Sequence, residues 1–159
     1  MIYDFKIITN EKRLRKVCKT CSDIDRAVAL GNQLLSFLKT TENGVGIAAP
    51  QVGLYERVCV VNVEKPIVLV NPKIVSSFQK IAFQEGCLSF PGQNIITQRY
   101  GNIAVKADNH KVPLFFNCEK NALECVCIQH EIDHLDGILM HDRKISLDDE
   151  KTVFIVKEK

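Results

Sequence analysis

The 159-residue chain lacks the features that would assign it to a membrane, to a secretory route or to a strongly charged partner. No apolar run approaches the roughly 20 residues of a membrane-spanning helix. Residues 1–6 carry an early acid and lack a signal-peptide profile. The formal net charge is only +2, which argues against a polyanionic partner. We therefore expect a cytoplasmic protein that binds neither a membrane nor a specific nucleic acid.

A local basic cluster is the main exception to this even charge distribution. The pattern is more typical of a solvated face than of an RNA contact. The cluster comprises Lys12, Arg13, Arg15, Lys16 and Lys19.

The seven cysteines lack the pattern of a disulfide framework. Their number is odd and no secretion signal accompanies them, which indicates reduced thiols. Cys18 and Cys21 form a CxxC pair, which could bind a metal or carry out redox chemistry. There is no second CxxC and no strand leads into this one, so a structural role is favoured for the pair.

The pentapeptide at residues 130–134, HEIDH, is the most informative feature that the chain does contain. Residues at i and i+4 of an α-helix lie about 40° apart around the axis, so both imidazoles can reach one metal ion. Glu131 would then lie close to a water held by that ion. This is the HExxH signature of hydrolytic metal sites. Two ordinary buried histidines are the plain alternative, so a third ligand has to be found.

The sequence around the pentapeptide favours the helix that this geometry requires. Residues 121–140 contain no proline, and their only glycine, Gly137, is a candidate stop. The apolar stripe and the two histidines recur at steps of three and four residues, which predicts a buried face for both rings. The inward stripe comprises Leu123, Val126, Cys127, His130 and His134, and the opposite side comprises Lys120, Glu124, Asp133 and Asp136.

Three kinds of third ligand compete. A third histidine is misplaced, because Met140 occupies the position used in HExxHxxGxxH and His141 is one residue late. The downstream glutamates Glu150 and Glu158 lie in a polar tail without a second helical motif. Cys87 follows a glycine at the end of a predicted strand, from which a ligand can project. Taken alone, such a cysteine is more often a small core residue.

A further segment, residues 44–53, is rich in small residues and contains one amide side chain, Gln51. By itself it fits a flexible turn before a strand. A phosphate loop is disfavoured because no lysine follows the glycines. Combined with the other two segments, it can supply close backbone approach and a neutral hydrogen-bond donor.

These three segments together resemble the peptide deformylase family. The family is marked, in this order, by GxGxAAxQ, EGCxS and HExxH. Here residues 44–51 read GVGIAAPQ, residues 85–89 read EGCLS and residues 130–134 read HEIDH, without a substitution at the defining positions. The resemblance extends over about residues 13–143, nearly the whole chain.

The resemblance implies one divalent metal ion. Cys87, His130 and His134 would bind it and leave a fourth position for water. Family members use Fe²⁺ readily, so Fe²⁺ is the ion expected in the cell, and Zn²⁺, Ni²⁺ or Co²⁺ are possible. A mixed set of thiolate and imidazole ligands excludes Mg²⁺ and Ca²⁺ as natural occupants.

The implied reaction removes the formyl group from the N-terminal methionine of a newly made polypeptide and releases formate. Water activated by the metal would be the nucleophile. Glu131 would take its proton and later pass it to the leaving amine. The side-chain amide of Gln51 and the backbone N–H of Leu88 would stabilise the oxyanion.

The resemblance also implies how N-formylmethionyl peptides bind. The peptide is expected to lie extended against backbone, as an added strand. Phe83 is bulkier than the aliphatic residue expected there in many relatives, so we expect a narrower methionine pocket. The backbone contacts would be Val45, Gly46 and Gly86, and the pocket would be lined by Phe83, Leu123, Val126 and Cys127.

The rest of the sequence fits one α+β catalytic domain over residues 1–159, with antiparallel β-sheets wrapped around the central metal-binding helix. Ser22 or Asp23 can cap a helix that extends to about Leu38. Its apolar face would comprise Ile24, Val28, Gly31, Leu35 and Leu38. Short strands are expected at residues 58–63, 67–70, 73–78, 81–83, 95–98, 103–107 and 112–116, and His110 in an exposed turn.

Other functions remain open. An HExxH metallopeptidase would release amino acids but not formate. A metal-stabilised binding protein would have no need of Glu131 or Gln51. A hydrolase with Cys87 as nucleophile would survive removal of the metal. We expect a monomer and, with a short tail at residues 145–159, at most a transient contact with the ribosome, because some bacterial members dock through a longer C-terminal helix.

Overall fold

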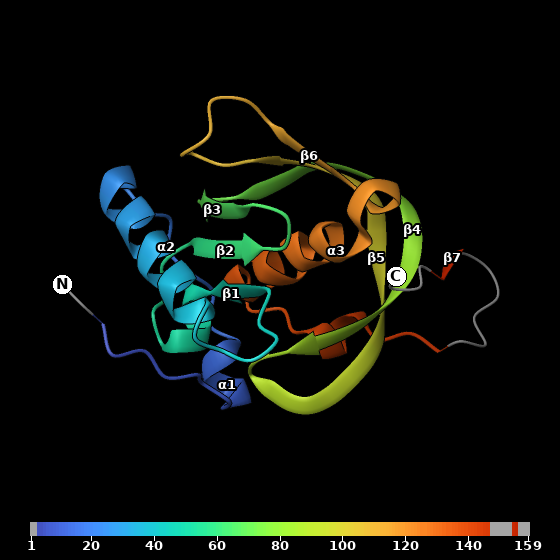
Figure 1. The fold of residues 1–159 in the computed structure, drawn as a ribbon, viewed down its shortest axis with the longest axis horizontal. Helices are drawn as coiled ribbons and strands as arrows, with labels where there is room; N and C mark the ends of the chain where they lie inside the picture. The colour runs from blue at the N-terminus through green and yellow to red at the C-terminus, as the bar shows by residue number, and fades with distance from the viewer. Residues whose placement is uncertain (1–2, 147–153, 156–159) are drawn as a thin grey trace.

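The computed structural model describes residues 3–146 and 154–155 of the chain (Figure 1). In chain order the elements are α1 (Glu11–Leu14), α2 (Ile24–Leu38), β1 (Gly46–Ala48), the 3-10 helix η1 (Ala49–Val52), β2 (Val58–Asn62), β3 (Pro66–Val70), β4 (Lys73–Cys87), β5 (Phe90–Lys106), β6 (Leu114–Asn117), α3 (Cys118–Leu135), the 3-10 helix η2 (Met140–Arg143) and β7 (Phe154–Ile155).

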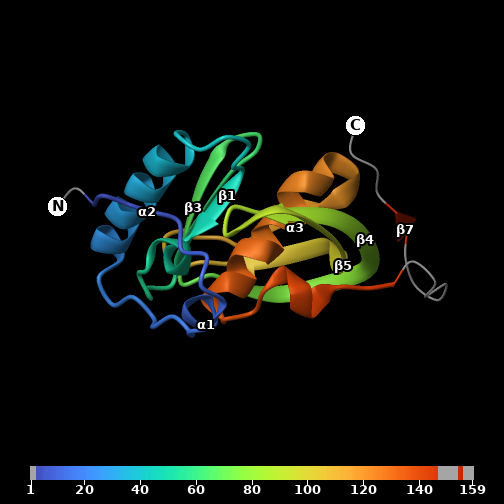
Figure 2. The same cartoon turned by 90° about the horizontal axis from the view of Figure 1, so that it is seen from below.

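Two β-sheets lie around the central helix α3, as Figures 1 and 2 show from two directions. The first sheet has the order β1-β2-β3, and the second has the order β6-β5-β4-β7. All neighbouring strands are antiparallel except β4 and β7, which pair in parallel. The predicted α+β architecture of antiparallel sheets around a central helix is confirmed, with this one parallel pair as the difference.

The first sheet is covered on both faces, by α2 on one side and by α3 on the other (Figure 2). The side chains of β2 point alternately toward the two helices. Val58 and Val60 belong to the apolar cluster formed with α2, whereas Cys59 and Val61 belong to the cluster formed with α3. Because successive side chains of a strand point to opposite faces, a continuous apolar run is what a doubly covered strand requires.

Helix α2 begins where the sequence predicts, because the side chain of its N-cap Asp23 accepts a hydrogen bond from the backbone N–H of Arg26 at 3.0 Å. The predicted buried face is wrong in part. Ile24, Val28 and Leu35 are only partly buried at its edge. The buried residues are Ala27, Leu30, Gly31, Leu34 and Leu38.

Gly31 explains where this buried face is centred. A Cβ atom added at Gly31 would lie 2.3 Å from Cγ1 of Val68 on β3. The helix therefore lies tightly against the sheet at its glycine, and the residues on the same side are the buried ones.

The second sheet is built on two long strands rather than on four short ones. The sequence predicts strands at 73–78 and 81–83, and at 95–98 and 103–107, but β4 and β5 each continue through the polar residues between these pairs. The ladder passes Gln79, which has a positive φ of 64°, with Phe78 opposite Asn102 and Lys80 opposite Tyr100. Pairing between two long strands overrides the local breaks that the sequence contains.

Strand β1 was not expected from the sequence, which favours a turn over residues 44–53. Its three residues are all buried, and Ile47 lies opposite Val60 of β2. Small residues make a poor strand pattern, but they allow this edge of the sheet to approach α3. The cleft described below depends on that approach.

Helix α3 ends where the sequence predicts. Its regular part begins after Asn121, whose backbone is non-helical and whose side chain accepts from the N–H of Glu124 at 2.9 Å. The chain leaves the helix through Gly137, which has a φ of 71° that glycine adopts without strain. One part of the prediction is wrong: Asp133, assigned to the outer side, is buried.

The structure also shows where several other residues discussed from the sequence lie. The five residues of the basic cluster are exposed, as expected. His110 lies in the predicted turn but is only half-exposed, because its Nε2 atom lies 2.9 Å from the carbonyl oxygen of Val68. Cys18 is buried and Cys21 half-buried, and neither forms a disulfide. Within residues 3–146 and 154–155, no helix is long and apolar enough to cross a membrane.

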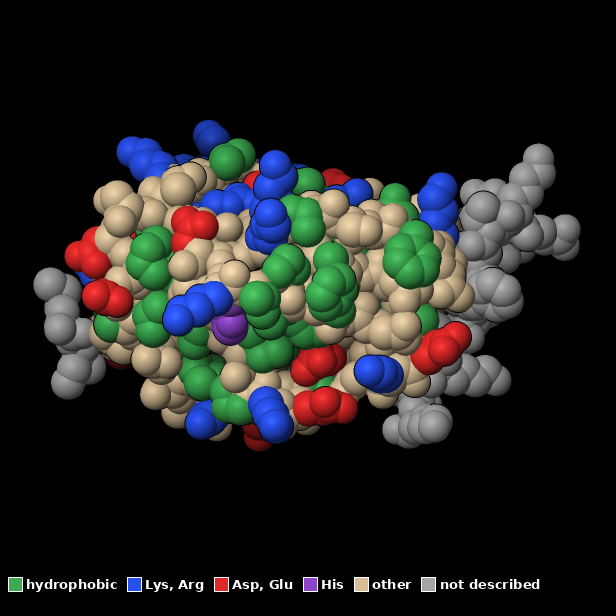
Figure 3. Space-filling model, turned by 90° about the horizontal axis from the view of Figure 1, so that it is seen from above, with side chains coloured by type: hydrophobic (Ala, Val, Ile, Leu, Met, Phe, Trp, Pro, Cys, Tyr) green, Lys and Arg blue, Asp and Glu red, His purple; other side chains and the backbone are tan. Residues whose placement is uncertain are grey.

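One face of the molecule carries a group of apolar side chains. Figure 3 looks onto the side where β6 lies, and apolar side chains gather near the middle of this face. Phe115 of β6 is 79% exposed. A shallow hollow beside it is lined by residues of α2, β3 and β6, and it shares no residue with the cleft described below.

Replacing Gly31 with leucine tests the close contact between α2 and β3. The added side chain has to displace Val68, and overpacking of this kind typically costs about 1–3 kcal/mol. We expect a loss of that size in the free energy of unfolding measured with urea. Asn32→Leu, at the exposed neighbouring position, is the control and should change it by less than about 0.5 kcal/mol. Equal losses in both variants would contradict the contact.

Candidate metal centre

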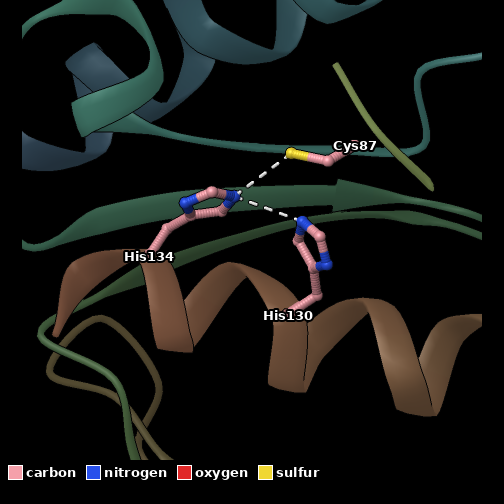
Figure 4. A group of neighbouring side chains, drawn as sticks. All are labelled: Cys87, His130 and His134. Atoms are coloured by element: carbon pink, nitrogen blue, oxygen red, sulfur yellow. Dashed lines mark hydrogen bonds between the residues drawn. The ribbon is translucent and has the colours of Figure 1, made fainter. Parts of the chain in front are cut away.

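Three potential metal ligands converge between the end of β4 and the helix α3 (Figure 4). The Sγ atom of Cys87 lies 3.5 Å from Nε2 of His134, and the Nε2 atoms of His134 and His130 lie 3.2 Å apart. All three ligand atoms lie within 4.8 Å of one another. Sulfur and nitrogen ligands of a tetrahedral ion, at about 2.0–2.3 Å from it, are about 3.3–3.6 Å apart. The spacing therefore fits a single ion at the centre of the group.

The ring of His130 is oriented by a carboxylate. Oε1 of Glu85 accepts a hydrogen bond from Nδ1 of His130 at 2.7 Å, and both side chains are buried. This bond holds one ring proton on Nδ1 and turns Nε2 toward Cys87 and His134. A carboxylate behind a histidine in this way is the usual support of a metal-bound imidazole.

The surroundings shift the pKa values of the two histidines in opposite directions. Burial lowers the pKa of His130, but the neighbouring Cys87 and Glu85 outweigh it and raise that pKa well above its ordinary value. Burial and the positive charge of His130 together lower the pKa of His134 well below its ordinary value. The surroundings thus favour a proton on His130 and disfavour one on His134. Metal ligands must be deprotonated, so a cation can take the place of that proton.

Two buried polar atoms at the site have no hydrogen-bond partner within the described part of the chain: Nδ1 of His134 and Oε2 of Glu131. Glu131 is 3% exposed, and burial raises the pKa of its carboxyl group to about 7. Buried groups without partners are uncommon and cluster at functional sites. The free oxygen of Glu131 is available to a bound water or substrate.

Gly46 of β1 allows this carboxylate to reach the site. A Cβ atom at Gly46 would lie 2.6 Å from Sγ of Cys127 and 2.7 Å from Oε1 of Glu131. Any side chain here would displace both groups of α3. The glycine is therefore needed for the close approach of β1 to the helix.

Gln51 is held with its amide N–H toward the site. Its Oε1 atom accepts from the backbone N–H of Ala48 at 2.9 Å, which fixes the orientation of the amide. Its Nε2 atom lies 3.5 Å from Sγ of Cys87 and 3.2 Å from Oγ of Ser89. A neutral donor thus lies beside the candidate ligand sulfur.

These groups open into one cleft with a volume of about 510 Å³. Each site residue expected from the sequence lines it except His134, which is buried beneath. The expected residues on its walls are Val45, Gly46, Gln51, Phe83, Gly86, Cys87, Leu88, Leu123, Val126, Cys127, His130 and Glu131.

The mouth of the cleft was missed from the sequence. It includes Glu42 and Asn43 on one side and residues 91–94 on the other. In the β4–β5 ladder Glu85 pairs with Ile95 and Cys87 with Phe90, so residues 91–94 form an irregular bulge opposite Gly86. The Pro91-Gly92 pair was the only signal in the sequence, and it indicated an end of the segment rather than a wall.

The sequence also gave no indication of a buried network of charged residues that supports His130. Nε and Nη2 of Arg99 donate to the two carboxylate oxygens of Glu85 at 2.6 and 2.8 Å. Nη1 of Arg99 donates to Asp133, and Thr97 donates to Glu85. Burial alone would raise the pKa of Glu85, but hydrogen bonds from Arg99 and His130 hold it well below its ordinary value. The network keeps the partner of His130 ionised.

The other candidates for the third ligand do not join the group. His141 lies outside it, with its Nε2 atom 2.7 Å from Oε1 of Gln93 and its ring against Phe90. Glu150 and Glu158 lie outside the described residues. Cys87 is the third residue that the fold brings to the two histidines.

Comparison with known proteins gives a consistent result. The family model described as "Polypeptide deformylase" matches residues 5–150. "Peptide deformylase 2" of Vibrio vulnificus (strain CMCP6) is 42% identical over 137 residues, which is 83% of this chain and 80% of that protein. "Peptide deformylase 2" of Vibrio cholerae is 41% identical over the same length and shares.

Solved structures agree. The crystal structure of peptide deformylase from Thermotoga maritima has a TM-score of 0.81 at 28% identity and covers 91% of this chain and 99% of that chain. A probable peptide deformylase from Synechococcus phage S-SSM7 has a TM-score of 0.77 at 34% identity, covering 88% and 99%.

The fold and the matched family together define a metal-dependent hydrolase that acts on C–N bonds other than peptide bonds. Within this class, the chain belongs to the polypeptide deformylase family. Its activity is removal of the N-formyl group from newly made polypeptides, and a metallopeptidase that cuts ordinary peptide bonds is not favoured.

Replacing Arg99 with methionine tests the buried ion network. The change keeps much of the volume but leaves Glu85 and Asp133 buried without their shared cation, and breaking a buried pair in this way typically costs about 3–5 kcal/mol. We expect a loss of that order in the free energy of unfolding of the metal-free protein. Arg26→Met removes an exposed pair with Glu56 and should cost less than about 1 kcal/mol. Similar losses in both variants would show that the network contributes no special stability.

Proposed function

We propose that Cys87, His130 and His134 hold one divalent metal ion in this deformylase. The observation that carries the proposal is the convergence of one sulfur and two Nε2 atoms at ligand spacing. The carboxylate behind His130 and the unpartnered polar atoms support it. When bound, the ion lowers the pKa of a water molecule and so supplies a nucleophile at neutral pH.

Fe²⁺ is the ion that we propose for the cell. A thiolate and two imidazoles disfavour the hard ions Mg²⁺ and Ca²⁺, and they suit Fe²⁺, Zn²⁺, Ni²⁺ and Co²⁺. The resemblance to the family, whose members use Fe²⁺ readily, favours Fe²⁺ among these.

Glu131 would move the proton. Its buried carboxylate lies in the cleft beside the candidate ligands, and one of its oxygens is free of other described protein groups. It would accept the proton of the attacking water and deliver it to the nitrogen of the departing amine, as a general base that becomes a general acid.

The oxyanion that forms from the formyl oxygen needs donors. Nε2 of Gln51 carries amide protons toward Cys87, and the backbone N–H of Leu88 follows Cys87 directly in the chain. Both residues line the cleft. Loss of one such donor typically lowers kcat by about 10²–10³.

The substrate would lie between two backbone edges. Val45 and Gly46 lie at β1, the edge strand of the first sheet, and Gly86 lies on β4 in the opposite wall. An extended peptide can add to such an edge through main-chain hydrogen bonds. The methionine side chain would enter the apolar part of the cleft formed by Phe83, Leu123, Val126 and Cys127.

The setting of the enzyme stays a proposal as well. We propose that it acts in the cytoplasm, where new polypeptides emerge, as a monomer with one catalytic domain over residues 1–159. A transient contact with the ribosome would fit this substrate. The tail residues 147–153 and 156–159 lie outside the described part of the chain.

Removal and return of the metal is the direct test. A chelator used without oxygen should abolish formate release from formyl-Met-Ala-Ser, and added Fe²⁺ or Ni²⁺ should restore it. The reason is that Cys87, His130 and His134 are the one group of ligands at metal spacing among the described residues. Formate release and bound metal are measured on the same sample.

Glu131→Gln is the matched control for this test. It should keep the metal and lower kcat by about 10²–10⁴, because the amide cannot carry the proton. Activity that survives the chelator would instead favour Cys87 as a nucleophile. Release of amino acids from unformylated peptides without formate would favour a peptidase.

Phe83→Leu tests whether Phe83 narrows the methionine pocket. The smaller residue frees volume next to Leu123, so substrates with bulkier first side chains should gain. We expect kcat/KM for formyl-Phe peptides to rise about tenfold relative to formyl-Met peptides, with norleucine changing like methionine. Phe78→Leu, an exposed position on the same strand, should leave the ratio unchanged. An unchanged ratio in Phe83→Leu would place the pocket elsewhere.

A further inference from the structure

A continuous chain of charged side chains connects the candidate metal centre to the 3-10 helix η2. Arg143 donates to Asp133 through Nη2 at 2.9 Å and Nε at 3.1 Å. Asp133 accepts in turn from Arg99, Arg99 donates to Glu85, and Glu85 holds Nδ1 of His130. Arg143 thus reaches His130 through three intervening side chains.

Arg143 is the member of this chain that extends furthest into solvent. Its side chain is 44% exposed, whereas those of Arg99 and Glu85 are each 3% exposed and that of Asp133 is 12% exposed. The two guanidinium groups and two carboxylates balance in charge. Without Arg143, Arg99 would be the only guanidinium group that pairs with the two buried carboxylates Glu85 and Asp133.

Arg99 couples Glu85 to Asp133 because its guanidinium group is planar and rigid. Arg99 uses Nε and Nη2 for Glu85 and Nη1 for Asp133, so any movement of Asp133 that rotates Arg99 also disturbs its two bonds to Glu85. Arg143 binds both oxygens of Asp133 and so limits this movement.

The backbone around Arg143 is fixed by contacts that do not involve the metal centre. The carboxylate of Asp142 accepts a hydrogen bond from the backbone N–H of Leu139 at 2.9 Å. Beyond η2, the backbone of Lys144 forms an antiparallel β-bridge with Thr97 of β5. The N–H of Ile145 donates a hydrogen bond to the carbonyl oxygen of Ile96 at 3.0 Å. Arg143 is therefore presented from a segment anchored to β5.

From this geometry we infer that Arg143 is a positioning residue for the metal centre, which sets the orientation of His130 through Asp133, Arg99 and Glu85. The inference rests on the proposed metal ligands. It assigns Arg143 no contact with substrate or metal. Its effect is on how well the ligand ring is pre-oriented, and hence on metal affinity.

The test compares Co²⁺ binding in Arg143→Gln with that in the unchanged protein. Loss of a direct supporting partner of a ligand typically costs 10–100-fold in metal affinity, so a residue three side chains away should cost about three- to tenfold. The dissociation constant is measured by competition with a chelator, and the visible absorption bands of bound Co²⁺ report the ligand geometry. We expect weaker binding and shifted bands.

Two variants separate positioning from stability. Arg143→Lys keeps the charge but not the two-point contact, so it should fall between the unchanged protein and Arg143→Gln, and it serves if Arg143→Gln does not fold. Arg15→Gln removes the ion pair to Asp142, the residue next to Arg143, and should change Co²⁺ affinity by less than about twofold. Urea unfolding of the metal-free variants measures any general loss of stability.

The inference is overturned if substitution at Arg143 lowers stability while Co²⁺ affinity and absorption bands match those of Arg15→Gln. A failure of the proposed metal centre itself would be seen in a different variant. Cys87→Ala would then bind Co²⁺ as tightly as the unchanged protein and with the same absorption spectrum.

Discussion

The carboxylate of Glu85 joins the parts of the site. One oxygen accepts from His130 of α3, and both oxygens accept from Arg99 of β5, while Glu85 itself lies on β4. An ionised carboxylate this deeply buried is costly unless nearly all of its lone pairs are occupied. Helix and strands can therefore meet only in the arrangement that supplies these donors. The same constraint that stabilises the packing also orients a ligand ring.

The second constraint is the narrow space between β1 and α3. Gly46 leaves no room for a side chain beside Glu131 and Cys127, so the edge of the first sheet lies directly against the functional face of the helix. A backbone edge, a carboxylate and the candidate ligands thus share a small volume. The candidate site therefore depends on the absence of a side chain at Gly46 as much as on the side chains that the helix provides.

Much of the site could be predicted from the sequence because its key residues lie in three short motifs with fixed spacing. Helix geometry alone predicts that the histidines at i and i+4 lie on one face, and Gly137 marks the end of that helix. The convergence of Cys87 with the histidines does not follow from local pattern. It was expected only through the resemblance, since Cys87 and His130 are 43 positions apart in the chain.

Other features could not be predicted because their partners are remote in the sequence. Asp133 looks like a surface charge on a helical wheel, and only Arg99, 34 residues away, makes its burial favourable. The breaks near Gln79 and Gly101 suggest separate strands, but they lie close to each other across the ladder and the pairing continues past them. A local sequence pattern shows a charge or a break in a strand, but it does not show the remote residue that pairs with it in the fold.

The bulge at residues 91–94 has a consequence for how such an enzyme diversifies. These residues form part of the cleft mouth, yet the β4–β5 ladder closes on either side of them at Cys87–Phe90 and Glu85–Ile95. Insertions or substitutions there need not shift the register that aims Cys87 and Glu85. The mouth of the cleft can therefore vary in evolution while the positions of Cys87 and Glu85 stay constant.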